Sequence, residues 1–385
     1  MLTNATPPLA RRVIPTTIDL GKGQPSLGLL PTAALRTAGE RFLAQHSASW
    51  LQYGDDRGEA PFLDSLAGFL TRRYSVPIHA SQLMTTAGNS QALDLCCTLF
   101  TRPGDTILVE EPTYFLALDI FRDHGLRVVG VPIDDDGMQT DALHEAVAHY
   151  RPALLYTIPS FQNPTGVTLS AARREQLLAT CAAHDVLVIA DEVYQLLDFG
   201  APPPPSLAIY ASGARVLSLG SFSKICAPGL RLGWVHGAPE LLERIMRSGL
   251  VQSGGGLNPF TSGVMYTLIT LGLADGVLDE LKTVYAERSR ALCGALREQL
   301  PFARFVAPRG GYFVWVTLPG ISANALLPFA REAGVAFHAG PRFVHGDRFD
   351  DALRLSFAHY DGEQLREGVQ RLARATLHYP DNPHA

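Results

Sequence analysis

The sequence predicts an α/β fold in which a large, mostly parallel sheet is sandwiched between helices and followed by a smaller α+β unit. Three observations support this prediction. The chain has 385 residues, of which 46% are hydrophobic, which is enough for an extensive core. Between residues 82 and 236, short apolar runs alternate with helical patterns, as expected for parallel strands covered on both faces. From residue 302 onward the strands become shorter, which marks the second unit.

The predicted elements of the large unit begin with two helices, over residues 31–45 and 60–74, whose apolar residues recur at helical spacing. Strands are predicted at the short apolar runs over residues 82–86, 106–109, 127–132, 153–158, 186–190 and 216–219, with a further one at 233–236. Helices are predicted between them, over residues 89–100, 113–124, 140–150 and 170–184. This alternation is typical of a sheet with helices on both faces.

The C-terminal part begins with a long helical stretch from Asn258 or Thr261 to residue 300, with a break expected at residues 272–276. Beyond it, strands are predicted at 312–317 and 353–357 and helices at 323–333 and 362–375. The ends are predicted as an extended arm over residues 1–18 and a disordered tail over residues 380–385. The predicted domains are residues 1–40 (the arm and part of the small domain), 41–285 (the large domain) and 286–385 (the C-terminal small domain).

Composition and charge narrow the function classes. The net charge is −5 without a basic block, so nucleic acid and anionic membranes are not expected as partners. No run approaches the ~20 apolar residues of a membrane span, and residues 1–20 lack a signal-peptide core. The five cysteines form no C-x-x-C pair and are expected to be core residues in a reducing compartment. His338 and His345 are expected in a loop, and no metal site is predicted.

Residues 216–233 (VLSLGSFSKICAPGLRLG) carry the strongest chemical signal. An apolar strand is followed by Ser221, Ser223 and Lys224, and Arg231 comes seven residues later, beyond a Pro-Gly break. A lysine in this place suits a reactive amine beside a bound phosphate, because burial or nearby cations lower its pKa from ~10.4. The alternative is an ordinary surface lysine in a turn.

Polar residues also follow the other strands, at the edge where ligands bind in open α/β sheets. Gly88, Asn89 and Ser90 form a strand-to-helix turn whose free N–H groups and helix dipole favour a phosphate. A single glycine there does not support dinucleotide binding. The remaining strand ends contribute Tyr114, Asn163, Asp191 and Tyr194.

Each of these residues also has a purely structural explanation. Ser90 could cap a helix, and Tyr114 could be ordinary packing. Asn163 lies in a good turn sequence, and Asp191 could be a solvated strand end. Their shared place at one edge of one sheet favours the functional explanation.

Together these motifs resemble the fold-type I enzymes that use pyridoxal 5′-phosphate (PLP), and within them the class I and II aminotransferases. The likeness is greatest to aminoadipate and kynurenine aminotransferases and to the aminotransferase domain of MocR-like regulators. It runs from about residue 19 to residue 371. Its most diagnostic motifs are N-P-T-G (163–166), D-E-V-Y (191–194), and S-F-S-K with R-L-G behind it (221–233). Without a preceding winged-helix segment, a full MocR-like regulator is not expected.

The resemblance implies three catalytic residues, Lys224, Asp191 and Tyr194. Lys224 would form the Schiff base with PLP and later move the substrate proton. Asp191 would keep the pyridine nitrogen protonated, which makes the ring an electron sink. Tyr194 and Asn163 would hydrogen-bond the phenolic oxygen, and Tyr114 would stack on the ring. The phosphate would be held by backbone N–H groups of Asn89 and Ser90, with Ser221, Ser223 and Arg231.

The resemblance also implies the substrate contacts. Arg354, in L-R-L-S, matches the small-domain arginine that grips the α-carboxylate, with Asn163 beside it. That grip orients the Cα–H bond for reaction. Gly23 matches the loop that closes over the carboxylate. Tyr53 matches a tyrosine that reaches the phosphate of the neighbouring subunit, which implies a homodimer with shared active sites. An ordinary strand arginine is the alternative for Arg354, but an unpaired buried charge is costly.

The sequence therefore predicts a cytoplasmic, PLP-dependent aminotransferase that moves an amino group between an α-amino acid and a 2-oxo acid by a ping-pong mechanism. Two alternatives stay open. One is another PLP reaction on an amino acid, such as decarboxylation, elimination or oxidation. The other is a non-catalytic domain that binds PLP or an effector. The sequence does not identify the amino acid, although Gln24, Leu27, Tyr53 and residues 253–258 are expected near its side chain.

Overall fold

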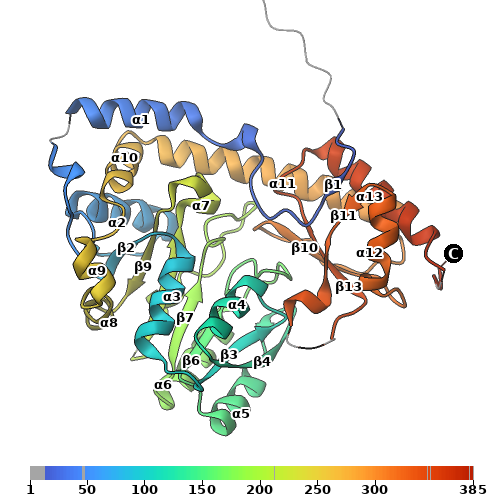
Figure 1. Ribbon diagram of the computed structural model, residues 1–385, viewed down its shortest axis with the longest axis horizontal. Coiled ribbons are helices and arrows are strands. Elements are labelled where there is room, and N and C mark those ends of the chain that lie inside the picture. Colours follow the sequence, from blue (N-terminus) through green and yellow to red (C-terminus); the bar gives the residue numbers. More distant parts are fainter. Residues whose placement is uncertain are drawn as a thin grey trace, which may run out of the picture.

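An eight-stranded sheet forms the centre of the larger half of the molecule (Figure 1). The computed structural model describes residues 14–45, 48–211, 213–344, 346, 348–380 and 382–384. The strands are β2 (Leu83–Thr86), β3 (Thr106–Glu111), β4 (Arg127–Asp134), β5 (Gly137–Met138), β6 (Leu154–Thr157), β7 (Leu187–Asp191), β8 (Val216–Ser221) and β9 (Gly233–Gly237). Their order is β2-β9-β8-β7-β6-β3-β4-β5. The five strands from β8 to β4 run parallel, whereas β9 and β5 are antiparallel to their neighbours. The mostly parallel sheet that the sequence predicts is confirmed.

Helices cover both faces of this sheet, because successive strand residues point to opposite sides. In β6, Leu154 and Tyr156 belong to one core while Leu155 belongs to the other. The core of Leu155 is closed by α5 (Thr140–Tyr150) and α6 (Ala171–Ala183). The opposite core is closed by α2 (Ala60–Tyr74), α3 (Asn89–Phe100), α4 (Phe115–Asp123) and α8 (Pro239–Met246). The apolar strands and both helical layers follow directly from the sequence pattern.

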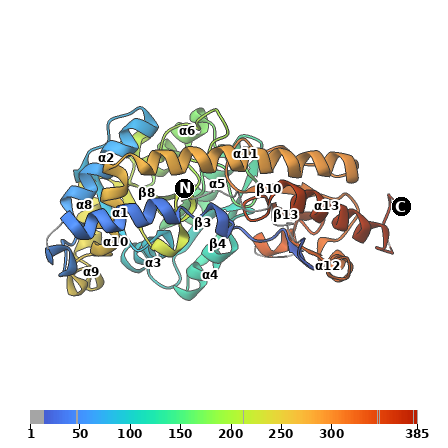
Figure 2. The same cartoon turned by 90° about the horizontal axis from the view of Figure 1, so that it is seen from above.

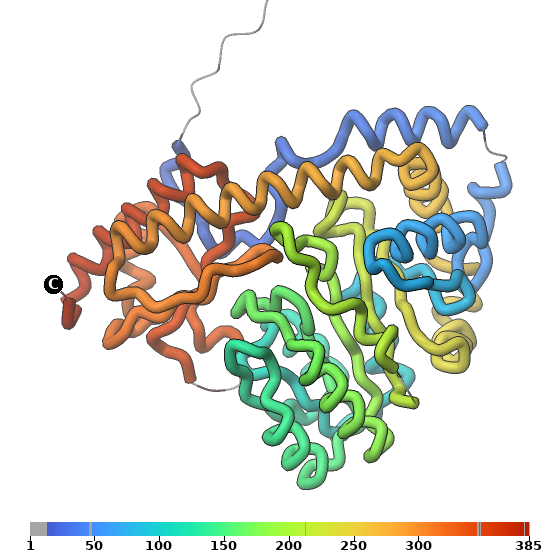
Figure 3. The backbone as a smooth tube through the Cα atoms, turned by 180° about the vertical axis from the view of Figure 1, so that it is seen from behind, coloured from blue at the N-terminus to red at the C-terminus, as the bar shows by residue number. Residues whose placement is uncertain are grey.

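One long helix joins the two halves of the molecule. Figures 1 and 2 show α11 (Leu273–Gln299), which is 27 residues long, running from the large sheet to the C-terminal unit. It follows α9 (Gly249–Gly254) and α10 (Pro259–Thr270), and α1 (Thr32–Gln45) lies beside α10, as Figure 3 also shows. The predicted break falls at Gly272, whose φ of +70° suits glycine. Among the described helices none is alone both long and apolar enough to span a membrane. The pair α10 and α11 meets the length and composition criteria only when taken together, across a bend of 82°.

The C-terminal unit is built on a three-stranded antiparallel sheet in the order β10-β13-β12. Its strands are β10 (Phe313–Thr317), β12 (His338–Ala339) and β13 (Ala352–Ser356), covered by α12 (Ala323–Glu332) and α13 (Gly362–Leu377). The N-terminal strand β1 (Ile18–Asp19) pairs in parallel with β11 (Val335–Ala336). The segment that follows β1 is thereby held against this unit although it is far away in sequence.

Several boundaries differ from the predictions. The short elements β5, α8 and α9 were not expected, since each is too short to show a clear period. The predicted disorder of residues 380–385 is wrong for 382–384, where Asn382 Nδ2 donates to Thr376 O at 2.9 Å and the His384 ring stacks on Phe302. Most of the predicted N-terminal arm, residues 1–13, and residues 381 and 385 lie outside the described residues.

Candidate active site

A cavity of about 390 Å³ lies at the carboxyl ends of the parallel strands, where the large sheet meets the C-terminal unit. Of the site residues predicted from the sequence, all but Tyr53 line it. These are Gly23, Asn89, Ser90, Tyr114, Asn163, Asp191, Tyr194, Ser221, Ser223, Lys224, Arg231 and Arg354. Residues more than 300 positions apart in the chain thus share one cavity, which chance placement of unrelated motifs does not explain.

Lys224 lies on α7 (Phe222–Ile225), the single helical turn directly after β8. Ser221 starts this turn by accepting a hydrogen bond from the backbone N–H of Ser223 at 3.1 Å. The Lys224 Nζ donates to the carbonyl of Gly23 at 2.8 Å. Burial, and then the positive charge of Arg354, lower the pKa of Lys224 to about 8, while Asp191 raises it. A considerable fraction of this amine is neutral near pH 7–8 and is therefore nucleophilic.

Asp191 ends β7 and is almost fully buried. Its Oδ1 accepts from Asn89 Nδ2 at 2.7 Å, and its Oδ2 accepts from the Tyr156 hydroxyl at 2.9 Å. Burial raises the pKa of Asp191, whereas these two hydrogen bonds lower it. The Asn89 side chain therefore supports the carboxylate in addition to the phosphate role predicted for its backbone N–H. Tyr156 was missed; its hydroxyl inside an apolar strand was the available signal, because a buried tyrosine usually finds a partner.

The start of α3 forms an anion cradle together with the segment around Lys224. Gly88 precedes the helix with a φ of +85°, and a Cβ added there would lie 2.8 Å from Arg231 Nη2. Arg231 Nη1 reaches Ser223 Oγ at 3.4 Å, and Ser221 Oγ donates to Ser223 Oγ at 3.0 Å. Free helix N–H groups, two hydroxyls and a guanidinium match the recognition of a phosphate.

Arg354 enters the cavity from β13 and is only 3% exposed. Its Nη1 donates to Asn163 Oδ1 at 2.9 Å and its Nη2 to Gly21 O at 2.7 Å, while its Nε has no hydrogen-bond partner. Burial lowers the pKa of Arg354 to about 10. A buried cation that pairs with no described carboxylate and keeps an unused donor is suited to an incoming carboxylate.

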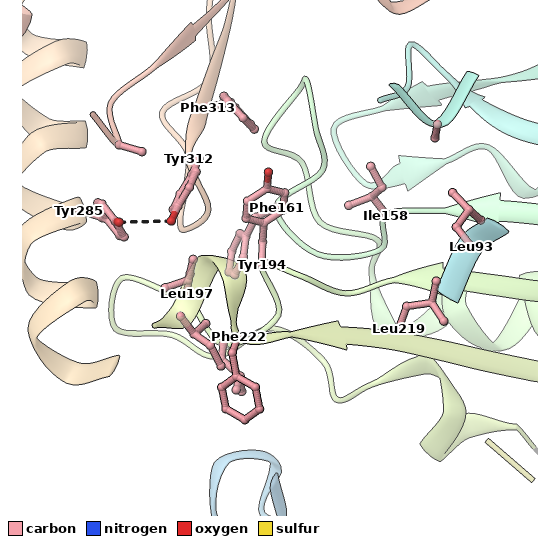
Figure 4. Close-up of a cluster of buried hydrophobic side chains, with 14 of the residues drawn as sticks. Leu93, Ile158, Phe161, Tyr194, Leu197, Leu219, Phe222, Tyr285, Tyr312 and Phe313 are labelled. Atoms are coloured by element: carbon pink, nitrogen blue, oxygen red, sulfur yellow. Dashed lines mark hydrogen bonds between the residues drawn. The ribbon is translucent and has the colours of Figure 1, made fainter. Parts of the chain in front are cut away.

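The aromatic residues give the cavity its shape. Tyr194 lies in a buried cluster with Tyr312 and Phe313, at ring-centroid distances of 5.4 and 5.9 Å (Figure 4). Burial raises the pKa of Tyr194, and it raises that of Tyr114 to about 12. Both phenols are therefore protonated near neutral pH and can donate hydrogen bonds.

Several residues lie elsewhere than in this cavity. Tyr53 is 81% exposed and lies outside it, and its predicted contact with the neighbouring subunit's phosphate stays a prediction. Gln24, Leu27 and residues 253–258, expected near the substrate side chain, do not line this chain's cavity. His338 is not in a loop; it lies on β12 and lines the cavity, whereas His345 is outside the described residues. Phe115 and Phe313 also line the cavity and were missed, because single aromatic residues carry no motif.

Comparison with known proteins agrees with this geometry. Residues 15–372 match the family model "Aminotransferase class I and II". The chain is similar to the aromatic-amino-acid aminotransferase 1 of Thermococcus litoralis, with 34% identity over 92% of this chain and 87% of that protein. Among solved structures it resembles kynurenine aminotransferase from Pyrococcus horikoshii in complex with PMP, with a TM-score of 0.87, 32% identity, and coverage of 94% and 91%.

A second solved structure shows a cofactor adduct. It is the α-aminoadipate aminotransferase LysN from Thermus thermophilus, complexed with N-(5′-phosphopyridoxyl)-L-leucine. It superposes with a TM-score of 0.83 at 34% identity, over 94% of this chain and 92% of that one. The predicted fold, cofactor and reaction type are thereby confirmed. The chain belongs to the class I and II aminotransferase family and is a PLP-dependent aminotransferase.

Proposed function

We propose that the cavity around Lys224 is the active site and that each predicted residue acts on PLP or on the substrate as the sequence implies. PLP supplies an aldehyde that reacts with amines and a ring that withdraws electrons. The lowered pKa of Lys224 supports its role as the reacting amine and as the group that carries the substrate proton. The observation that carries this proposal is the meeting of Lys224, Asp191 and Arg354 in one cavity.

Cofactor binding divides among three parts of the cavity. Asp191, kept in place by Asn89 and Tyr156, would pair with the ring nitrogen. Asn163 and Tyr194 would donate to the phenolic oxygen, and Tyr114 would stack on the ring. The N–H groups of Asn89 and Ser90, with Ser221, Ser223 and Arg231, would hold the phosphate at the start of α3. The negative phosphate and the positive ring nitrogen would each meet a group of opposite charge.

The substrate α-carboxylate is assigned to Arg354, assisted by Asn163 and by the segment at Gly23. The unused Nε and the absence of an ion pair with any described residue support this assignment. A guanidinium binds a carboxylate with two parallel hydrogen bonds, so it fixes the direction of the Cα–H bond as well as the position of the substrate.

The substrate side chain is proposed to be aromatic or large and apolar. Phe115, Phe313 and Phe343 surround Arg354, with ring centroids 5.9, 4.0 and 5.0 Å from its guanidinium carbon. Two of the relatives' names point the same way, an aromatic-amino-acid and a kynurenine aminotransferase, whereas a third relative is named for α-aminoadipate. A screen of phenylalanine, tyrosine, leucine and 2-aminoadipate as amino donors tests the idea. Turnover highest for 2-aminoadipate would contradict it.

A homodimer with shared active sites is also proposed. Tyr53 is highly exposed, and exposed apolar residues also lie on α1, on α9, on α10 and between α1 and α2, namely Leu43, Leu250, Phe260 and Leu51. Large exposed apolar side chains are typical of an interface, and an interface that included Tyr53 would let it reach the partner's cradle. Sedimentation and a Tyr53→Ser variant with weakened cofactor binding would test it.

The domain division and location remain proposals as well. The boundaries 1–40, 41–285 and 286–385 are supported by the pairing of β1 with β11, which attaches the N-terminal segment to the C-terminal unit. A cytoplasmic location is supported by the five cysteines, all of which are buried and free.

The decisive experiment replaces Lys224 by alanine. Lys224→Ala is expected to abolish the visible absorbance of the bound cofactor and its half-reaction with amino acids, because Lys224 is the buried amine with the lowered pKa in this cavity. Lys22→Ala is the matched control: this lysine also lines the cavity but is exposed, and its loss should leave the absorbance in place. Unchanged absorbance and turnover in Lys224→Ala would rule the site out.

A further inference from the structure

A buried carboxylate lies close to the active-site cavity but does not line it. Glu110, on β3, is 2% exposed and does not line the cavity. Its Oε1 accepts from Thr157 Oγ1 at 2.6 Å, and its Oε2 accepts from Ile158 N at 3.0 Å and Gln162 Nε2 at 3.1 Å. Ile158 N and Gln162 Nε2 can only donate, and the Thr157 hydroxyl donates in this arrangement. The site therefore suits an ionised carboxylate, which only accepts.

Gln162 transmits the position of Glu110 to the neighbouring turn. Its Nε2 also donates to Pro112 O at 2.8 Å, while its Oε1 accepts from the N–H and the hydroxyl of Thr165 at 2.9 and 2.7 Å. If the amide were flipped, its oxygen would face two acceptors, Glu110 Oε2 and Pro112 O, and its nitrogen would face the N–H of Thr165. Glu110 and Thr165 therefore fix the orientation of the Gln162 side chain, and this pins the 162–166 turn.

Asn163 is the next residue in this turn, and its Oδ1 accepts from Arg354 Nη1 at 2.9 Å. An unbroken series of contacts thus leads from Glu110 in the core, through Gln162 and the turn, to the cation in the cavity. We propose that Glu110 is a positioning residue, which acts through Gln162 to hold Asn163 where it meets both Arg354 and the cofactor. This inference rests on the cofactor role proposed above for Asn163.

The electrostatic surroundings agree with this role. Burial raises the pKa of Glu110 to about 7, while its hydrogen bonds from Thr157, Ile158 and Gln162 lower it and the charge of Asp191 raises it. The other titratable group facing it is Tyr156, on the neighbouring strand β6. The ionised form, with all three contacts intact, is therefore favoured above neutral pH.

The test compares holoenzymes carrying Glu110→Gln and the wild-type residue. The new amide can keep the three contacts only by turning its nitrogen to Thr157 Oγ1, and it loses the negative charge that strengthens the hydrogen bond from Gln162 Nε2, so the hold on Gln162 weakens. The expected result is a shifted midpoint in the pH titration of the visible cofactor absorbance, because Asn163 moves relative to the phenolic oxygen. In addition, kcat/KM for the amino acid should fall roughly tenfold, mainly through KM, because Arg354 loses its support.

Two controls separate positioning from a general loss of structure. Thr157→Val removes one contact to Glu110 without touching Gln162 and should leave KM close to the wild-type value. Gln162→Leu leaves Glu110 its two other donors but breaks the connection, and should reproduce the effects of Glu110→Gln. It carries the test by itself should Glu110→Gln fail to fold. The double variant Glu110→Gln/Asn163→Ala should be no worse than Asn163→Ala, since both changes act on the same contact.

The outcomes distinguish this inference from the site assignment. If Asn163→Ala leaves the absorbance titration unchanged, the proposed cofactor role of Asn163 is wrong. If Asn163→Ala shifts the titration but Glu110→Gln and Gln162→Leu behave like the wild type, the positioning role of Glu110 is overturned. An equal rise in KM in Thr157→Val would likewise overturn it, because that variant keeps Gln162 in place.

Discussion

Two buried arginines stand near the 159–169 segment and differ in how their donors are used. Arg174, on α6, is 0% exposed and donates to Pro159 O at 2.9 Å, Leu169 O at 3.0 Å and Pro205 O at 2.8 Å, and also to Ser160 Oγ. Arg354, in the cavity, makes two such contacts and leaves Nε unused. Neither pairs with a described carboxylate.

This difference is what we expect between a structural cation, Arg174, and a cation proposed to receive a ligand, Arg354. The carbonyl oxygens of Pro159, Leu169 and Pro205 accept hydrogen bonds from the charged Arg174. Pro159 and Leu169 lie at the two ends of the segment that carries Asn163, so Arg174 holds these ends together. Arg354 faces a cavity and is surrounded by aromatic rings, which solvate a cation only partly. Burial alone, which lowers the pKa of both arginines, does not reveal the function. The two arginines are distinguished by how many of their N–H donors have a hydrogen-bond partner.

Replacing the cavity arginine should have the largest effect on activity. Arg354→Met is expected to lower kcat/KM for amino acids, because the substrate carboxylate loses its buried partner. The loss corresponds to about 2–5 kcal/mol of transition-state stabilisation. The stability of the fold should change little, since an uncompensated buried charge is removed. Steady-state kinetics and urea unfolding measure the two quantities. A large loss of stability in Arg354→Met would mean that Arg354 has a structural role like that of Arg174, and the distinction drawn between the two arginines would be wrong.

Replacing the structural arginine should give the opposite result. Arg174→Met is expected to lower the free energy of unfolding by about 3 kcal/mol, since buried carbonyls at Pro159, Leu169 and Pro205 lose their donor. Activity per folded molecule should fall much less than in Arg354→Met. Urea unfolding, together with kinetics corrected for the cofactor-loaded fraction, gives both numbers. If Arg174→Met kept its full stability but lost activity, Arg174 would be a functional residue and its assignment as a structural cation would be wrong.

The pKa of Lys224 offers a finer distinction between the two cations. Arg354 helps to lower this pKa to about 8, so its loss should raise the pKa, whereas Arg174 is not among the causes of the shift. Only the neutral amine attacks an aldehyde, so the rate of cofactor capture by the cofactor-free chain should rise with pH through this pKa. Its midpoint should move upward by roughly one unit in Arg354→Met and not in Arg174→Met.

The smallest expected effect concerns Asp191. Tyr156→Phe removes one of its two side-chain donors, which should raise the pKa of this carboxyl further and weaken its hold on the ring nitrogen. Cofactor affinity is expected to fall by about 1 kcal/mol, as measured by equilibrium titration. Tyr285→Phe is the matched control, because its hydroxyl pairs with Tyr312 outside the cavity.

The large unit could be predicted because most of its site residues lie at or shortly after the carboxyl end of a strand. Asp191 and Lys224 need only the strand assignment and the rule that ligands bind at the carboxyl edge. The parts contributed by side-chain packing could not be predicted. His338 lies in a strand of two residues, and Phe115 and Tyr156 look like ordinary apolar positions until the fold brings them beside the cavity. Glu110 was hidden for the same reason, since its partners are known only once β3 and β6 are adjacent.

The separation of the site along the chain has a consequence for biosynthesis. All residues assigned to the cofactor lie between Tyr53 and Arg231, and the large sheet is complete when β9 has been made. Arg354 leaves the ribosome much later. Because chains begin to fold from their N-terminal parts during translation, the proposed coenzyme pocket is expected to form before Arg354, the proposed partner of the substrate carboxylate, has been synthesised.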